Sequence, residues 1–113
     1  MAGPLSGIKL VEFAGIGPGP FCGMILADLG AEIIRIDRAS QHDQGNTIDF
    51  QHRSKSSLSA DLKNPKTIEE IKKLLASVDG LIEGFRPGVM ERLGLGPEEC
   101  LKINSNLVYG RMT

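Results

Sequence analysis

The sequence predicts an α/β fold with a mostly parallel sheet and flanking helices. Short apolar segments alternate along the chain with segments whose apolar residues recur at helical spacing. Residues 8–38 give a strand, a glycine-rich loop, a helix and a second strand in succession. The length of 113 residues is that of one domain, and 41% hydrophobic and 24% charged residues are ordinary for a globular protein. Strands that alternate with helices pair in parallel through right-handed crossovers.

The first strand is predicted at Ile8–Phe13, because its apolar character suits a strand that is buried on both faces of a parallel sheet. Pro20 fits the first position of a helix that continues over Phe21–Leu29. Gly30 fits the left-handed cap of that helix. The second strand is predicted at Glu32–Ile36.

The loop after the first strand does not fit a dinucleotide-binding fingerprint. Gly15, Gly17 and Gly19 alternate with prolines, and Pro20 stands where a G-x-G-x-x-G turn has its last glycine. Pro18 and Pro20 also lack the backbone N–H groups that such a loop directs at pyrophosphate. The loop therefore argues against binding of NAD.

The second half of the chain is predicted to contain three more strands and three helices. One helix starts at Asn64-Pro65, which supply a cap and a first-turn proline, and its apolar residues follow helical spacing to Leu75. Thr67 and Glu70 offer a capping box in the same segment. The other elements are predicted as strands at Leu58–Leu62, Leu81–Glu83 and Asn106–Met112, and as helices at Val89–Leu93 and Pro97–Ile103.

Several features narrow the class of protein. The net charge of -1 argues against bulk attraction to nucleic acid or membrane, and no apolar run approaches the roughly 20 residues that span a bilayer. Cys22 and Cys100 lack metal-ligand spacing, so both are interpreted as buried apolar residues in a reducing compartment. The polar segment Ala39–Lys55, with His42 and His52, is predicted to be a surface excursion. These features predict a soluble protein that is cytoplasmic or lies in the matrix of an organelle.

Four basic residues follow the predicted strands. Arg38 follows the second strand and Lys63 the third, whereas Arg86 follows the fourth and Arg92 lies on the short helix beyond it. The carboxyl ends of parallel strands meet at one edge of a sheet, where ligands bind in open α/β folds. The four side chains either converge on a phosphorylated ligand or are ordinary solvated cations.

Three acidic residues have two interpretations each. Glu12 and Glu83 lie within or at the end of apolar strands, so each either pairs with an arginine or takes part in catalysis. Asp37 stands where a dinucleotide-binding protein places its ribose-binding acid, but the preferred interpretation is a salt-bridged surface carboxylate. No metal-ligand set and no nucleophile motif is evident in the sequence.

The last predicted strand has no helix after it before the sequence stops at Thr113. A parallel sheet is normally covered on both faces, so residues 1–113 are interpreted as the incomplete N-terminal portion of a longer protein. The alternative is a complete small domain whose fifth strand lies at an exposed edge.

Taken together, the segments resemble the family III CoA-transferase group along essentially the whole chain. The most specific segment is Glu83-Gly84-Phe85-Arg86-Pro87-Gly88. The other matching segments are Pro4-Leu5-Ser6-Gly7-Ile8, Val11-Glu12 before Gly17-Pro18-Gly19-Pro20, Leu26-Ala27-Asp28-Leu29-Gly30-Ala31, Asp61-Leu62-Lys63, Leu93-Gly94-Leu95-Gly96-Pro97 and Leu107-Val108-Tyr109.

Within that group, two segments look like the α-methylacyl-CoA racemase branch. They are Arg35-Ile36-Asp37-Arg38 and Tyr109-Gly110-Arg111-Met112-Thr113. One segment departs from the pattern, because Arg53-Ser54-Lys55-Ser56 has a serine where arginine is usual. A phosphate contact there is expected to be weaker.

The resemblance implies a Rossmann-like, CoA-binding half of a larger enzyme that forms an interlocked homodimer. It implies that CoA is bound at four places in the chain, which agrees with the basic residues found above. The implied contacts are Arg38, the turn Ala60-Asp61-Leu62-Lys63, the segment Gly84-Phe85-Arg86, and Arg92.

The implied activity is that of an isomerase of lipid metabolism that racemises 2-methylacyl-CoA without metal, flavin or nicotinamide. A histidine and an aspartate would remove and return the α-proton through an enolate, and the resemblance places both beyond Thr113. No catalytic residue is therefore assigned in this chain. The alternatives are a CoA-transferase that works through an aspartyl thioester, and a non-catalytic CoA-binding module.

Overall fold

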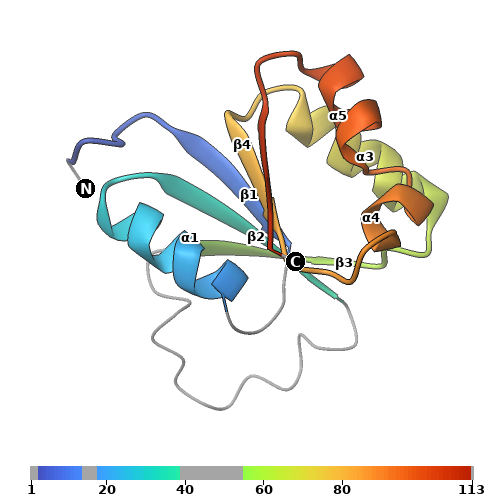
Figure 1. The fold of residues 1–113 in the computed structure, drawn as a ribbon, viewed down its shortest axis with the longest axis horizontal. Helices are drawn as coiled ribbons and strands as arrows, with labels where there is room; N and C mark the ends of the chain where they lie inside the picture. The colour runs from blue at the N-terminus through green and yellow to red at the C-terminus, as the bar shows by residue number, and fades with distance from the viewer. Residues whose placement is uncertain (1–2, 14–17, 39–54, 113) are drawn as a thin grey trace.

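The computed structural model describes residues 3–13, 18–38 and 55–112, and Figure 1 shows their arrangement. In this part of the chain, a sheet of five strands has the order β3-β2-β1-β4-β5, and every neighbouring pair is parallel. This confirms the predicted parallel α/β fold, and the order is that of a Rossmann-like sheet. The strands are β1 (Lys9–Phe13), β2 (Glu32–Arg38), β3 (Lys55–Ala60), β4 (Gly80–Glu83) and β5 (Val108–Arg111).

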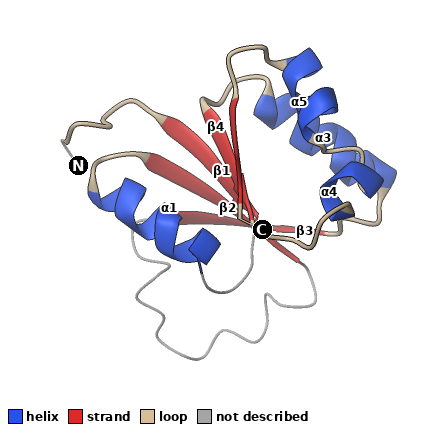
Figure 2. Cartoon of the chain, viewed as in Figure 1, coloured by secondary structure: helices blue, strands red, loops and turns tan. Residues whose placement is uncertain are grey.

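Helices flank both faces of the sheet (Figure 2). Helix α1 lies on one face, whereas α3, α4 and α5 lie together on the other. The helices are α1 (Pro18–Asp28), α3 (Pro65–Leu75), α4 (Val89–Arg92) and α5 (Pro97–Ile103). None of the helices in the described ranges has both the length and the apolar character needed to traverse a lipid bilayer.

The larger hydrophobic core lies between the sheet and helices α3 to α5. Val11 and Phe13 of β1 and Leu81 of β4 point into it and are at most 2% exposed. Neighbouring residues of a strand point to opposite faces, so Leu10 and Ile33 contribute instead to a smaller core beneath α1. The face that carries α3 to α5 is therefore the better covered one.

Helix α3 matches its prediction, including the Asn64 cap, except for the predicted capping box. The side chain of Asn64 accepts a hydrogen bond from the backbone N–H of Lys66 at 3.0 Å, so Asn64 is the N-cap and Pro65 starts the helix. The predicted capping box of Thr67 and Glu70 is wrong, because Thr67 lies inside the first turn and not before it.

Several predicted boundaries shift by a few residues. Helix α1 starts at Pro18, before Pro20, although Gly30 has the expected positive φ of 107° beyond its end. Strand β3 is Lys55–Ala60 and not Leu58–Leu62, because its serines pair in register with β2 despite a low strand propensity. Strand β1 is buried only toward its carboxyl end, since Lys9 is exposed.

Candidate binding site at the carboxyl edge of the sheet

All five described strands end at the same edge of the sheet. The last residues of these strands are Phe13, Arg38, Ala60, Glu83 and Arg111. This is the edge at which open α/β sheets bind ligands. The predicted site residues follow β2, β3 and β4 here, so the topology brings their backbones to one side of the molecule.

Lys63 and Arg92 meet at an open depression beside helix α3. The depression has a volume of about 440 Å³, and both side chains are exposed at its surface. Its described lining consists of Leu62, Lys63, Pro65, Ile68, Glu69, Arg92 and Leu93. The walls therefore combine apolar side chains with two cations and one carboxylate.

The turn after β3 is held by Asp61. The carboxylate Oδ1 of Asp61 accepts a hydrogen bond from the backbone N–H of Lys63 at 3.0 Å, and its carbonyl accepts one from Asn64 at 3.1 Å. Ala60 and Asp61 line a separate depression of about 330 Å³ between β3 and α3. Of the four predicted turn residues, only Leu62 and Lys63 therefore line the depression that contains Arg92.

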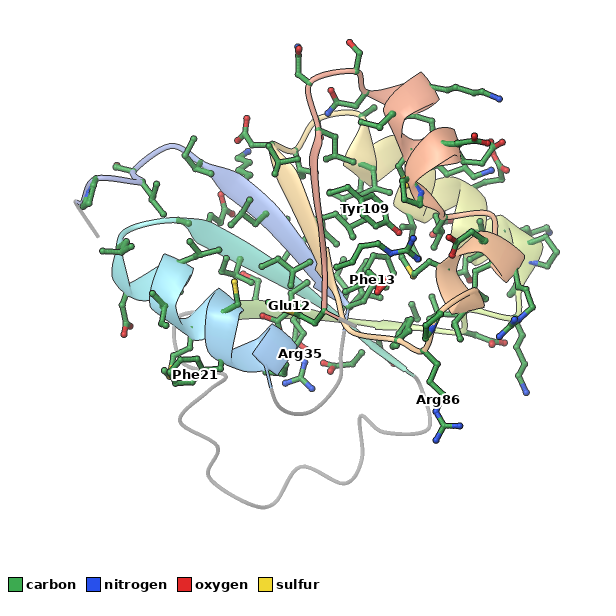
Figure 3. All side chains as sticks on the ribbon, in the orientation of Figure 1. Glu12, Phe13, Phe21, Arg35, Arg86 and Tyr109 are labelled. Carbon is green, nitrogen blue, oxygen red and sulfur yellow. The ribbon has the colours of Figure 1, made fainter. Side chains whose placement is uncertain are left out.

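The loop after β4 divides its residues between the core and solvent. The ring of Phe85 packs edge-on against Phe13, with 6.2 Å between the ring centroids, so Phe85 anchors the loop to the core. Gly84 and Arg86 are exposed, and Figure 3 shows Arg86 directed away from the sheet. Arg86 is not among the residues that line the depression with Lys63 and Arg92.

Gly88 allows Arg92 to fold back over the loop. Its φ is 88°, in the left-handed region, and a Cβ there would lie 3.0 Å from Nη1 of Arg92. The Arg92 guanidinium therefore lies against the backbone at Gly88. Arg38 ends β2, but its side chain is not among the described parts of the structure. Outside the described residues lie Gly15, Gly17, His42 and His52.

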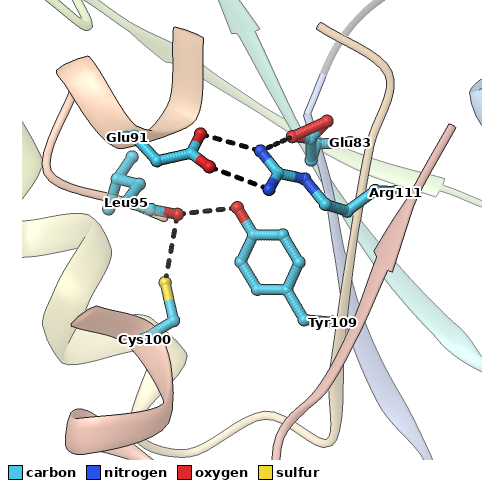
Figure 4. A network of polar contacts seen from close by, with 6 residues as sticks. All are labelled: Glu83, Glu91, Leu95, Cys100, Tyr109 and Arg111. Atoms are coloured by element: carbon cyan, nitrogen blue, oxygen red, sulfur yellow. Dashed lines mark hydrogen bonds and ion pairs between the residues drawn. The ribbon is translucent and has the colours of Figure 1, made fainter. Parts of the chain in front are cut away.

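A network of charged and polar groups joins β4, β5 and α4 (Figure 4). Arg111 binds both carboxylate oxygens of Glu91, at 2.9 and 2.8 Å, and its Nη2 lies 3.4 Å from Oε2 of Glu83. Glu83 is 1% exposed, and its contact with Arg111 is the arginine pairing that one of its two interpretations predicted. Tyr109 lies beneath the Arg111 guanidinium at 5.5 Å from the ring centroid.

The pKa values of the two carboxyl groups in this network are shifted in opposite directions. Hydrogen bonding to Arg111 lowers the pKa of Glu91 from 4.5 to about 2. Burial raises the pKa of Glu83 above its ordinary value, although Arg111 opposes that effect. The contact of Glu91 with Arg111 was not predicted from the sequence, because it joins residues that are 20 positions apart in the chain.

The α1 face of the sheet carries a second group of charges. Glu12 is fully buried and lies opposite Arg35 in the register of β1 and β2. Arg35 Nε lies 2.7 Å from Oδ1 of Asp37, and Ser57 donates a hydrogen bond to the same carboxylate. Asp37 is salt-bridged as expected, but it is 9% exposed and thus not a surface residue.

Two further expectations concern metal ligands and cysteines. Across the described ranges, no group of three or more His, Cys, Asp or Glu side chains is placed to hold a metal ion. Cys100 is fully buried, as expected, whereas Cys22 is only partly buried. The prediction for Cys22 is wrong because it lies on α1, whose outer side is open: Phe21 and Ile25 are exposed there as well.

A comparison of the chain with known families identifies its family. A model of CoA-transferase family III matches residues 5–113. The chain belongs to CoA-transferase family III. This confirms the resemblance drawn from the sequence, and the family includes racemases as well as CoA-transferases.

Relatives from both reaction classes align with nearly the whole chain. It is 45% identical to alpha-methylacyl-CoA racemase of Mus musculus, over 96% of this chain and 28% of that protein. It is 34% identical to succinyl-CoA–D-citramalate CoA-transferase of Chloroflexus aurantiacus, over 97% of this chain and 30% of that protein. The chain thus spans less than a third of the length of these family members.

A solved structure superposes closely on this fold. The crystal structure of Rv3272 from Mycobacterium tuberculosis gives a TM-score of 0.92 at 36% identity, over 99% of this chain and 32% of that chain. A putative betaketoacyl-ACP reductase gives a TM-score of 0.56 at 18% identity, which reflects a shared fold alone. The Rossmann-like architecture is therefore confirmed.

Proposed function

We propose that this chain is the CoA-binding part of an enzyme that racemises 2-methylacyl-CoA. The observation that carries the proposal is the depression at which Lys63 and Arg92 meet. CoA carries phosphate groups on two sides of its ribose. Cationic side chains bind such groups through charge-assisted hydrogen bonds. Arg92 offers a two-pronged guanidinium and Lys63 a point charge.

The rest of the proposed site extends from this depression. Arg38 and Arg86 would add positive charge from β2 and from the loop after β4. The backbone that surrounds the ligand would come from Ala60, Asp61, Leu62, Gly84 and Phe85. Phe85 would act indirectly, because its ring packs on Phe13 and fixes the loop that carries Arg86.

In this proposal the chain binds and orients the thioester, and does not transfer the proton. Racemisation removes the α-proton and returns it to the opposite face through an enolate. Groups that perform these steps are expected outside residues 1–113, in an interlocked homodimer that needs no metal or redox cofactor. Binding energy at Lys63 and Arg92 would hold the α-carbon at the reacting groups.

The racemase assignment is supported by the identity of 45% to a protein of that name. It is also supported by Arg35-Ile36-Asp37-Arg38, which looks like the racemase form of the second strand. The second candidate is a CoA-transferase, which the similarity to a succinyl-CoA–D-citramalate CoA-transferase favours. A non-catalytic CoA-binding module is the third.

Two assays on the native-length protein separate these functions. A racemase exchanges the α-proton of (2S)- or (2R)-2-methylacyl-CoA for deuterium in D2O and interconverts the two epimers. A CoA-transferase instead moves CoA to an added carboxylic acid. Epimerisation without an acid acceptor supports the proposal, whereas CoA transfer without epimerisation contradicts it, as does binding of CoA without either reaction.

Kinetics of variants test the binding role. Arg86→Gln and Arg92→Gln remove positive charge and should raise the KM for the acyl-CoA, by about tenfold for Arg92→Gln. Lys102→Gln is the matched control, because Lys102 is an exposed cation on α5 that does not line the depression. Unchanged kinetics in both arginine variants would count against the assignment.

A further inference from the structure

Helix α4 carries Arg92 but is too short to be stable by itself. It spans the four residues Val89–Arg92, a single turn, and an isolated turn costs more to form than its hydrogen bonds return. Met90 is fully buried and packs into the main core, which fixes one side of α4. The orientation of Arg92 therefore depends on what holds the other side of this turn.

Glu91 joins α4 to strand β5. Both of its carboxylate oxygens accept hydrogen bonds from Arg111, at 2.8 and 2.9 Å (Figure 4). A two-point contact between guanidinium and carboxylate fixes the relative orientation of the two groups as well as their distance. The contact thus resists rotation of α4 about its own axis.

Arg111 is itself held firmly. It lies opposite Glu83 in the register of β4 and β5, and the backbone N–H of Met112 donates to the carbonyl of Glu83 at 3.0 Å. The guanidinium also lies over the ring of Tyr109 and near the Glu83 carboxylate. Glu91 is therefore tied to β5, the edge strand of the described sheet, and not to a loop.

Glu91 and Arg92 are consecutive residues with different surroundings. Consecutive residues point about 100° apart around a helix, so one turn can direct them to different places. Glu91 meets Arg111, whereas Arg92 lines the depression with Lys63 and lies against Gly88. Fixing the first side chain consequently fixes the direction of the second.

We propose that the Glu91–Arg111 pair positions Arg92 for binding of the CoA phosphates. The inference rests on the proposed function and assigns Glu91 and Arg111 as positioning residues that do not touch the ligand. A preorganised Arg92 loses less conformational freedom when the phosphate binds than one on a loose turn. Loss of the pair should weaken CoA binding by about 3- to 10-fold, the range expected for the ordering cost of one long side chain.

A double-mutant cycle on the native-length protein tests the inference. The dissociation constant of coenzyme A itself is measured by calorimetry for the wild type, Glu91→Gln, Arg92→Gln and the double variant. Glu98→Gln is the matched control, because Glu98 is an exposed carboxylate on α5. If Glu91 acts through Arg92, then Glu91→Gln weakens binding in the wild type and adds nothing once Arg92 is absent.

Each outcome is decisive. The positioning role is overturned if Glu91→Gln does not weaken CoA binding, or if it weakens binding equally with and without Arg92. Either result leaves the proposed function standing when Arg92→Gln itself binds CoA poorly. Wild-type affinity in Arg92→Gln overturns the positioning role and also removes Arg92 from the proposed CoA site. Arg111→Lys provides a second variant, which keeps the charge but loses the two-pronged contact. It should weaken CoA binding by about 3- to 10-fold, as Glu91→Gln should.

Discussion

The phenol of Tyr109 donates a hydrogen bond of 2.7 Å to the backbone carbonyl of Leu95. The same carbonyl accepts a weaker contact from the Cys100 thiol at 3.3 Å. These contacts join β5 to the segment between α4 and α5, which leads from the depression back into the core. The edge strand therefore takes part in holding the site.

Replacement of Tyr109 by phenylalanine should cost about 1 kcal/mol in the free energy of unfolding, the usual value of a hydrogen bond. The cost should stay near that value because the Leu95 carbonyl keeps its contact with Cys100. Urea unfolding of the native-length protein measures the change. No change in stability would show that the phenol is not hydrogen-bonded in solution.

Stability in acid should depend on Glu91. Its pKa in the folded chain is about 2, against 4.5 ordinarily, so between these values the unfolded state binds more protons. The contribution of Glu91 is fully present above pH 4.5 and is lost as the pH falls toward 2. Glu83 acts in the opposite sense, because its raised pKa favours the folded state as it becomes protonated.

The unfolding midpoint, followed from pH 6 to pH 2, tests this effect. Glu91→Gln should be less stable than the wild type at pH 6 and should lose less stability on acidification. Glu98→Gln serves as the control and should follow the wild-type curve. Parallel curves for Glu91→Gln and wild type would contradict the lowered pKa of Glu91.

Alanine should be poorly tolerated at Gly30. The residue has a φ of 107°, and a Cβ would lie 3.2 Å from both the N and the Cα of Gly3, which are backbone atoms. Gly7 is the matched control, since its φ is 91° but nothing lies within 4 Å of the added Cβ. The positive φ alone costs about 1–2 kcal/mol in either variant. Thermal unfolding should show a larger loss of stability for Gly30→Ala than for Gly7→Ala. Equal losses of stability would argue against the close contact with Gly3.

The cap of α3 should contribute to stability. Asn64→Ala removes the hydrogen bond to the backbone N–H of Lys66 and should cost about 1 kcal/mol. Asn64→Asp keeps an acceptor at the same place and should cost less. Chemical unfolding of the two variants checks the order, and an equal loss in both would contradict the cap.

The elements that were predicted well have local signals. Asn64-Pro65 marks the start of α3, Pro97–Ile103 is α5 without any shift, and Gly30 has the left-handed conformation expected after a helix. In each case the signal lies in residues next to the feature, so no tertiary contact is needed to locate it. The parallel sheet follows from the alternation of such elements.

The elements that were missed depend on contacts between distant residues. Strand β3 is polar and is specified by its pairing with β2, which no local propensity reveals. Arg111 and Glu91 are 20 residues apart, and only the return of β5 to the sheet edge brings them together. Asp37 is buried because Arg35 and Ser57 satisfy it, which the sequence spacing does not indicate.

Binding of coenzyme A to the native-length protein tests the central claim most directly. The account predicts that Lys63→Gln combined with Arg92→Gln raises the dissociation constant by roughly 10- to 100-fold, as expected for lost charge-assisted hydrogen bonds. Lys73→Gln combined with Lys102→Gln removes the same charge from residues that do not line the depression. This control should leave the dissociation constant unchanged. Equal affinities in the two double variants would contradict the account.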